Sequence, residues 1–213
     1  MSDRTPETHD TLPEAPPHDT IDQSRRKLAG AALGVPAIFT LASRPVWASQ
    51  CSISGMASGN LSAPKGPACA GCTPGYWNQC QHLDSWAATG YSPNDSFNTV
   101  FGVTQYINPK NNQPYTLLQV MGLQGSGNCT PDTVQPNCNA KPNGAAIGNM
   151  GCDPIFVNLG FHAVAALLNS AHPDVNFGYT PGELTELFRN NLHRAAELKD
   201  SLAMLNERGC PLN

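Results

Sequence analysis

The sequence predicts a small, mainly α-helical domain with long irregular loops that disulfide bonds hold together. In two segments near the C-terminus, residues 155–171 and 180–206, apolar residues recur with the period of an amphipathic helix. No segment shows the apolar–polar alternation of a half-buried strand. The chain also contains eight cysteines, an even number that predicts four disulfides in an exported protein, at Cys51, Cys69, Cys72, Cys80, Cys129, Cys138, Cys152 and Cys210.

The N-terminal region has the pattern of an export signal. Residues 1–24 carry six acidic residues and almost no large apolar one, so we expect a disordered polar lead. Residues 25–48 then contain paired Arg25 and Arg26, an apolar run and small residues before a predicted cleavage after Ala48. Paired arginines after a polar lead are typical of the twin-arginine class, which carries folded proteins. An uncleaved membrane anchor is the alternative, for which the run is short.

This signal predicts a bacterial protein of the periplasm, the cell surface or the medium, with the twin-arginine translocation machinery as its partner during export. Cleavage would leave 165 residues with seven Lys and Arg and ten Asp and Glu, a formal net charge of −3. The scattered cations give no basic patch, so we expect no nucleic-acid binding. No second apolar run approaches twenty residues, so we expect no membrane span in the mature protein.

The mature chain divides into a flexible Ser-, Gly- and Pro-rich arm, residues 49–68, and a Cys-rich domain, residues 69–213. In the first half of the domain, Thr73-Pro74-Gly75 is a turn signal. Ser92 and Pro93 predict a helix start, and Gly102 its end. We expect a polar surface loop at 103–115, a short helix at 116–122, and a loop at 124–150.

The second half of the domain has stronger helix signals. The first helix, residues 155–171, should end before His172-Pro173, because proline disfavours helix in the residue that precedes it. The second begins at Thr180 with Pro181 at its first position and Glu183 three residues after the cap, which predicts a capping box. Its apolar face then continues to Asn206, and Gly209 follows.

Three cysteines and one histidine of the central stretch, residues 69–86, have metal-ligand character: Cys69, Cys72, Cys80 and His82. Thiolates and an imidazole at this spacing could hold zinc or an iron–sulfur cluster. A redox-active Cys-x2-Cys is a further alternative. No second Cys-x2-Cys follows, and the neighbouring Thr-Pro-Gly turn does not open a helix of a βαβ unit. Disulfides and no cofactor are therefore the favoured interpretation.

Four bridges allow 105 connectivities, so spacing alone does not assign them. We predict that Cys72 pairs with Cys210, which would tie the Thr73-Pro74-Gly75 turn to the last helix. We also predict that Cys129 pairs with Cys138, which would close the long loop.

Aromatic residues of the central stretch are candidates for ligand binding, because their rings can stack on sugars: Tyr76, Trp77 and Trp86. The favoured alternative is that they plug the core of a Cys-rich domain, with Trp77 buried and Tyr76 partly exposed. If the protein binds a ligand, we expect the binding surface at the exposed edges of these rings and at the 103–115 and 124–150 loops.

Catalytic signatures are missing from the sequence. It has no Gly-x-Ser-x-Gly, no His-Glu-x-x-His and no paired-carboxylate motif. His162 lies in an apolar helix, where we expect a helix-interface histidine with a backbone partner. Asp174 and Asn176 are expected to cap or turn the chain. We assign no catalytic residue, and a secreted hydrolase is the third alternative.

The segment Cys72-Thr-Pro-Gly-Tyr-Trp77 resembles the Thr-Pro-Gly-Tyr-Trp-Lys-Asn-His motif of secreted bacterial proteins of unassigned activity. The resemblance extends over most of the mature chain, through Asp84-Ser-Trp86, residues 97–102, 162–169 and 173–176, and 205–211. The sequence departs from the motif at Asn78-Gln-Cys80, so a role of the motif histidine would need His82 in its place. The resemblance implies an exported surface or matrix protein without established catalysis.

Together these observations predict an exported, non-catalytic structural or binding module, with a cell-surface or glycan partner. A metal-binding or redox protein using the cysteine and histidine cluster is the main alternative.

Overall fold

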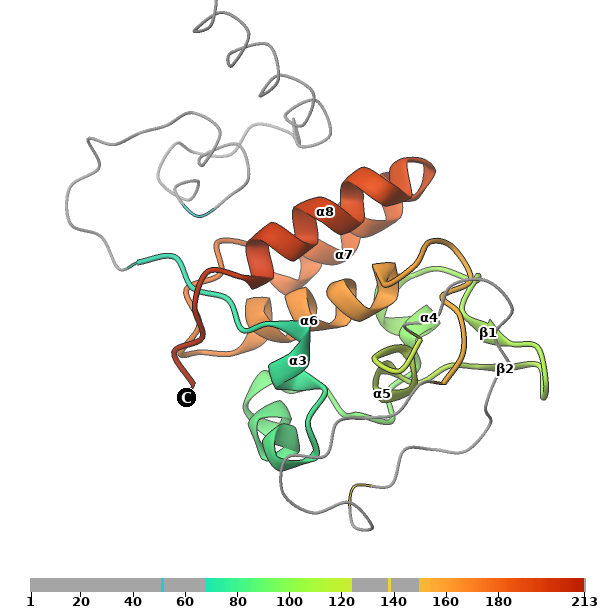
Figure 1. The fold of residues 1–213 in the computed structure, drawn as a ribbon, viewed down its shortest axis with the longest axis horizontal. Helices are drawn as coiled ribbons and strands as arrows, with labels where there is room; N and C mark the ends of the chain where they lie inside the picture. The colour runs from blue at the N-terminus through green and yellow to red at the C-terminus, as the bar shows by residue number, and fades with distance from the viewer. Residues whose placement is uncertain (1–50, 52–67, 124–137, 139–149, 213) are drawn as a thin grey trace, which may run out of the picture. The chain divides into compact units, whose positions relative to one another are not determined.

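A computed structural model describes residue 51, residues 68–123, residue 138 and residues 150–212. Over these ranges the chain is mainly helical and disulfide-bonded, which confirms the predicted class (Figure 1). One two-stranded antiparallel ribbon is its only sheet there. The elements in order are α3 (Pro74–Trp77), η4 (Cys80–Thr89), α4 (Phe97–Phe101), β1 (Ile107–Asn108), β2 (Gln113–Pro114), α5 (Leu117–Val120), α6 (Leu159–Ala171), α7 (Pro181–Asn190), η6 (Leu192–Arg194) and α8 (Ala195–Asn206).

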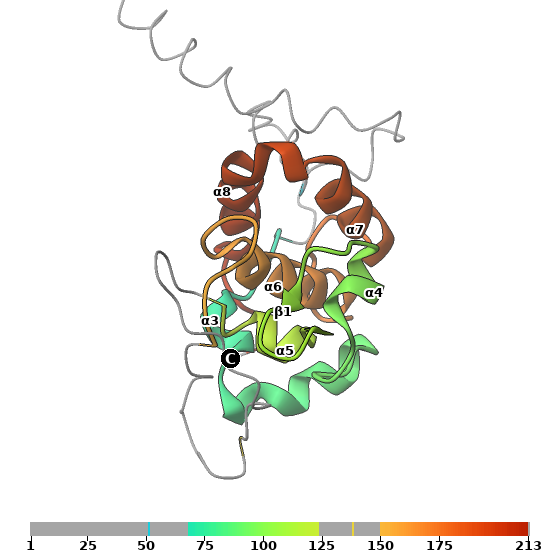
Figure 2. The same ribbon diagram turned by 90° about the vertical axis from the view of Figure 1, so that its right-hand side faces the viewer.

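Helix α6 is the central element of this part of the chain. It contacts α3, η4 and α5 on one side and α7 and α8 on the other (Figures 1 and 2). All residues from Ala163 to Asn169 are buried, so the helix is enclosed rather than amphipathic in its second half. The small alanines of this run let the neighbouring elements approach closely. The predicted end of the helix before His172-Pro173 is confirmed.

The predicted C-terminal helix is divided, contrary to expectation. Its first part, α7, begins with the predicted capping box: the Glu183 amide donates to the Thr180 hydroxyl, and the Thr180 amide donates to the Glu183 carboxylate at 2.8 Å. The helix ends before Asn191, whose side-chain amide donates to the Leu187 carbonyl at 2.7 Å. This side chain competes for a backbone acceptor of the last turn, and the chain turns through η6 into α8.

Helices α6 and α8 run in the same direction. Asn169 near the end of α6 contacts Asn206 at the end of α8, while His162 near the start of α6 lies close to Lys199. Helix α7 therefore connects the end of α6 to the start of α8, and Figure 2 shows α8 to the left and α7 to the right of α6.

The expected helix at 92–102 begins later than predicted. Ser92 and Pro93 form a turn in which the Ser92 amide donates to the Asp95 carboxylate at 2.8 Å. Helix α4 starts after Ser96, whose hydroxyl accepts from Thr99, and ends at Gly102 as predicted. The Thr73-Pro74-Gly75 turn signal likewise opens the one-turn helix α3, with Thr73 as its cap.

The 103–115 segment is not the polar surface loop that we predicted. It forms the β1–β2 ribbon, and both its tyrosines point into the core, with Tyr106 0% and Tyr115 2% exposed. Two aromatic residues in a short segment bury enough apolar area to outweigh its polar composition. Residues 109–114 at the end of the ribbon remain exposed.

The predicted N-terminal lead, the predicted signal peptide and most of the predicted arm and 124–150 loop lie outside the described residues. Of the helices in the described ranges, none is long and apolar enough to cross a bilayer.

Candidate functional site around the Cys72–Cys210 disulfide

Three disulfides join described residues: Cys51–Cys69, Cys72–Cys210 and Cys80–Cys138. The predicted bridge between Cys72 and Cys210 is confirmed. The predicted bridge between Cys129 and Cys138 is wrong, because Cys138 is bonded to Cys80 and thereby ties the long loop to η4. Cys152 is also disulfide-bonded.

The alternative metal or redox site does not form in this structure. Cys69, Cys72 and Cys80 each bond a different distant cysteine, so none of them is a free thiolate ligand and the first two are not a redox pair. No other group of three ligand-type side chains gathers within the described ranges. His82 instead stacks on the Tyr76 ring, with centroids 4.0 Å apart.

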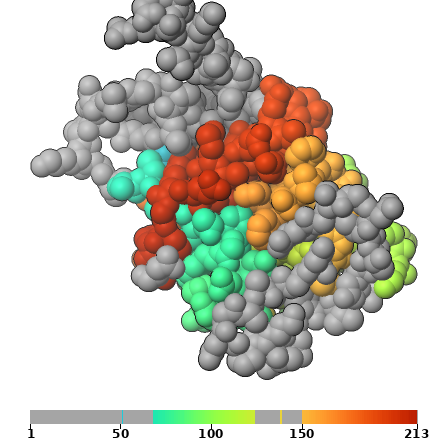
Figure 3. Space-filling model, in the orientation of Figure 1, coloured from blue at the N-terminus to red at the C-terminus, as the bar shows by residue number. Residues whose placement is uncertain are grey.

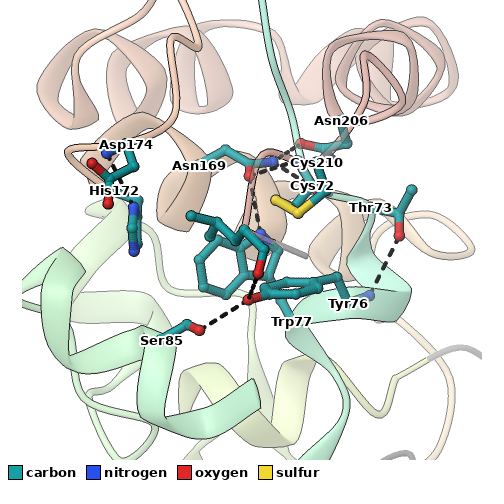
Figure 4. The surroundings of a disulfide bond; sticks show 11 residues. Cys72, Thr73, Tyr76, Trp77, Ser85, Asn169, His172, Asp174, Asn206 and Cys210 are labelled. Atoms are coloured by element: carbon teal, nitrogen blue, oxygen red, sulfur yellow. Dashed lines mark hydrogen bonds between the residues drawn. A yellow bond between two sulfur atoms is a disulfide. The ribbon is translucent and has the colours of Figure 1, made fainter. Parts of the chain in front are cut away.

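A buried asparagine, Asn169, organises the surroundings of the Cys72–Cys210 bridge (Figure 4). Its side-chain oxygen accepts from the Cys72 amide at 2.8 Å and from the Trp77 indole at 3.1 Å. Its side-chain nitrogen donates to the Cys72 carbonyl at 2.8 Å and to the Asn206 side-chain oxygen at 2.9 Å. These four bonds use the full hydrogen-bonding capacity of an amide side chain, so burial costs no unsatisfied group.

Asn206 extends this network to the first turns of α6. Its side-chain nitrogen donates to the His162 carbonyl at 3.0 Å, and its side chain is fully buried, like that of Asn169. Sequence reasoning assigned no role to either asparagine. The available signal was an amide residue among the apolar residues near the end of each run, because such a residue is buried only when it has partners.

The aromatic residues considered for ligand binding belong to the core. Trp77 is 0%, Trp86 1% and Tyr76 8% exposed, so the predicted partial exposure of Tyr76 is wrong. The Trp86 indole donates to the Trp77 carbonyl at 3.2 Å. The Tyr76 hydroxyl bonds the Ser85 hydroxyl at 2.9 Å. With His82 covering its ring, Tyr76 presents no free face on which a sugar could stack, and the rings plug the domain.

Two described residues of the predicted arm, Cys51 and Ala68, are bonded away from the Cys72–Cys210 bridge. Arg208 donates from Nη1 to the Cys51 carbonyl and to the Phe177 carbonyl, and burial lowers the pKa of its guanidinium. The Asn176 side chain donates to the Ala68 carbonyl at 3.3 Å. Asn176 thus holds the backbone at Ala68, whereas the turn lies at residues 173–174.

Within the described ranges, the remaining histidines form no catalytic group. The His172 Nδ1 atom accepts from the Asp174 amide at 3.2 Å, which is a turn contact. His162 Nδ1 is buried and has no hydrogen-bond partner in the described part of the chain, so the expected backbone partner is not found. Burial lowers the pKa of His162 to about 4, with Lys199 contributing in the same direction. None of these rings bonds a serine or cysteine there that could act as a nucleophile.

Models of known protein families, curated proteins and solved structures gave no match to this chain.

Proposed function

We propose that the chain is an exported, non-catalytic structural or binding module, carried folded by the twin-arginine route and stabilised outside the cytoplasm by disulfides. The observation that carries this proposal is that the side chains of the central stretch are bonded or buried within the domain. Its cysteines are in disulfides, its tryptophans are buried, and the buried amide of Asn169 binds the backbone of Cys72. The cysteines and tryptophans, which are the side chains best suited to catalysis or ligand binding, thus stabilise the fold instead.

A second support for the proposal is that disulfides fit an oxidising compartment outside the cytoplasm. Disulfides persist in oxidising surroundings and are rare in the cytoplasm, so a domain with three bridges among its described residues fits an exported protein. Arg25 and Arg26 would direct export, and cleavage after Ala48 would release the mature chain. The resemblance to secreted proteins with the Thr-Pro-Gly-Tyr-Trp motif agrees with this route.

Export is tested with the full-length chain in a bacterial host. We expect the wild-type protein in the exported fraction, with the mass of residues 49–213 and with thiols that alkylate only after reduction. Replacement of the pair by Arg25→Lys and Arg26→Lys should keep the precursor in the cytoplasm. The control Arg4→Lys makes the same change in the polar lead and should be exported normally. Normal export of the double variant would contradict the twin-arginine route.

A cell-surface or glycan partner is proposed for the exposed end of the ribbon, residues 109–114, because the rings of the central stretch are enclosed. Pull-down with isolated peptidoglycan tests this placement. Binding should fall when Lys110→Ala and Gln113→Ala are combined and should persist in Tyr76→Phe, which keeps the buried ring. Loss of binding in Tyr76→Phe alone would move the site back to the central stretch.

A further inference from the structure

Two Gly-Cys dipeptides meet at the Cys72–Cys210 bridge. Gly71 and Gly209 form an isolated antiparallel bridge in which the Gly71 amide donates to the Gly209 carbonyl at 3.1 Å. A Cβ atom at Gly71 would collide with the Leu205 carbonyl oxygen, and Gly209 has a φ of +94°. Both positions therefore favour glycine, the first for lack of space and the second for its left-handed backbone.

The backbone of Cys72 is also hydrogen-bonded by a side chain of α6. Asn169 binds both its amide and its carbonyl at 2.8 Å, and Asn206 links Asn169 to the end of α8. Figure 3 shows the surfaces of α8 and of the segment after residue 68 side by side. None of these bonds uses a sulfur atom. They join Cys72 to the segment that leads into Cys210 through groups other than the two sulfurs.

We infer that this junction, made of residues 71–72, Asn169 and residues 206–210, assembles before the Cys72–Cys210 bond, and that the bond locks a junction already formed. The inference rests on the proposed function for its setting: a chain that folds in a reducing cytoplasm needs a junction that forms without disulfides. The fully satisfied amide of Asn169 supplies this, since buried polar networks are stabilising only when every member has its partners.

Locking requires a disulfide oxidant, such as glutathione disulfide or an exported oxidoreductase. One cysteine thiolate attacks the oxidant's disulfide and releases one thiol, forming a mixed disulfide. The second thiolate then attacks the cysteine sulfur of that mixed disulfide and releases the other thiol. Two electrons pass to the oxidant, and the two cysteine protons end on its two thiols. Because the junction holds the cysteines together, their effective concentration favours this pair over the six other cysteines.

The test is thiol protection in the reduced, full-length chain under native conditions. After reduction with a phosphine, alkylation by N-ethylmaleimide is followed by peptide mass spectrometry. Cys72, which is fully buried, should alkylate at least about tenfold more slowly than the partly exposed Cys69, and the two rates should become equal in guanidinium. Equal rates of Cys72 and Cys69 in the native buffer would overturn the inference.

A matched pair of variants assigns the protection to the amide network. Asn169→Ala should remove the protection of Cys72 and give mixed pairings on reoxidation with glutathione disulfide. Asn190→Ala, an exposed asparagine in α7, should behave as the wild type. Mixed pairings in neither variant would show that the amide does not direct the bridge.

Because Asn169→Ala could unfold the domain, the double variant Cys72→Ser and Cys210→Ser gives an independent measurement. The Trp77 indole N–H, bonded to Asn169, should remain slow to exchange with deuterium in this variant. Rapid exchange would contradict a junction that forms without the bond. These readouts use purified protein, so a failure of export with protection retained would reject the proposed function and leave this inference standing.

Discussion

The Tyr106 hydroxyl donates to the carboxylate of the buried Asp153, with oxygen distances of 3.1 and 3.3 Å. The same carboxylate accepts from the amides of Ile155 at 3.0 Å, Phe156 at 3.3 Å and Gly160 at 2.6 Å. Burial raises the pKa of Asp153, while these donors act in the opposite direction. The pair joins the segment before β1 to the N-terminal end of α6, where a carboxylate is also favoured by the helix dipole.

Removing the hydroxyl of Tyr106 should destabilise the domain. Tyr106→Phe keeps the buried ring and deletes one charge-assisted bond, which we expect to cost about 1.5–3 kcal/mol of unfolding free energy in urea. Tyr115→Phe is the matched control, because the Tyr115 hydroxyl bonds no other described residue. Equal losses in the two variants would show that the bond to Asp153 contributes nothing.

Stability should fall in mild acid because of His162. Its pKa is about 4 in the folded chain and 6.5 when exposed, so the unfolded chain binds the proton first as the pH decreases. Relative to its value above pH 6.5, the free energy of unfolding should be lower by about 2 kcal/mol at pH 5 and by roughly 3 kcal/mol below pH 4.

Urea unfolding between pH 7.5 and 4 checks this dependence. His162→Gln should flatten it, whereas His193→Gln, at an exposed position in η6, should leave it unchanged. A slope that survives His162→Gln would assign the effect to another group.

Two glycines should respond to alanine with opposite signs. Gly71→Ala places a methyl group against the backbone oxygen of Leu205, which no side-chain rotation relieves, and should cost about 1–3 kcal/mol. Gly182→Ala lies in the first turn of α7 with open space around it and should gain up to about 1 kcal/mol from helix propensity. Thermal unfolding measures both, and a neutral Gly71→Ala would contradict the close approach.

The disulfides should differ in their contributions to stability. Cys72 and Cys210 are 138 residues apart, and Cys51 and Cys69 are 18 apart. Chain-entropy arguments then assign about 5 kcal/mol to the first bridge and about 3 kcal/mol to the second. Guanidinium unfolding of the two double-serine variants should reproduce this order. The reverse order would indicate that unfolded-state structure, rather than loop length, sets the effect.

Cys152 should pair with Cys129. Three described bridges take six of the eight cysteines, Cys152 is disulfide-bonded, and Cys129 is the remaining one in the sequence. Peptide mapping of the non-reduced protein should recover this linked pair. Recovery of Cys152 linked to any other cysteine would contradict the assignment.

Much of the fold was accessible from local patterns. The Thr180–Glu183 capping box, the end of α6 before Pro173 and the end of α4 at Gly102 all depend on contacts within four residues, which adjacent sequence specifies directly. The split of α7 from α8 was missed because Asn191 uses its side chain on a carbonyl of its own helix, a choice that periodicity does not show.

What the sequence by itself determined was the mainly helical class, the cysteine-rich character, the start of α7 and the ends of α4, α6 and α8. Only the tertiary structure decided that Cys138 bonds Cys80 and that Asn169 binds Cys72, 97 residues away. Spacing along the chain carries little information about such partners, because they are chosen by which buried groups packing brings together and by the requirement that each find a hydrogen bond.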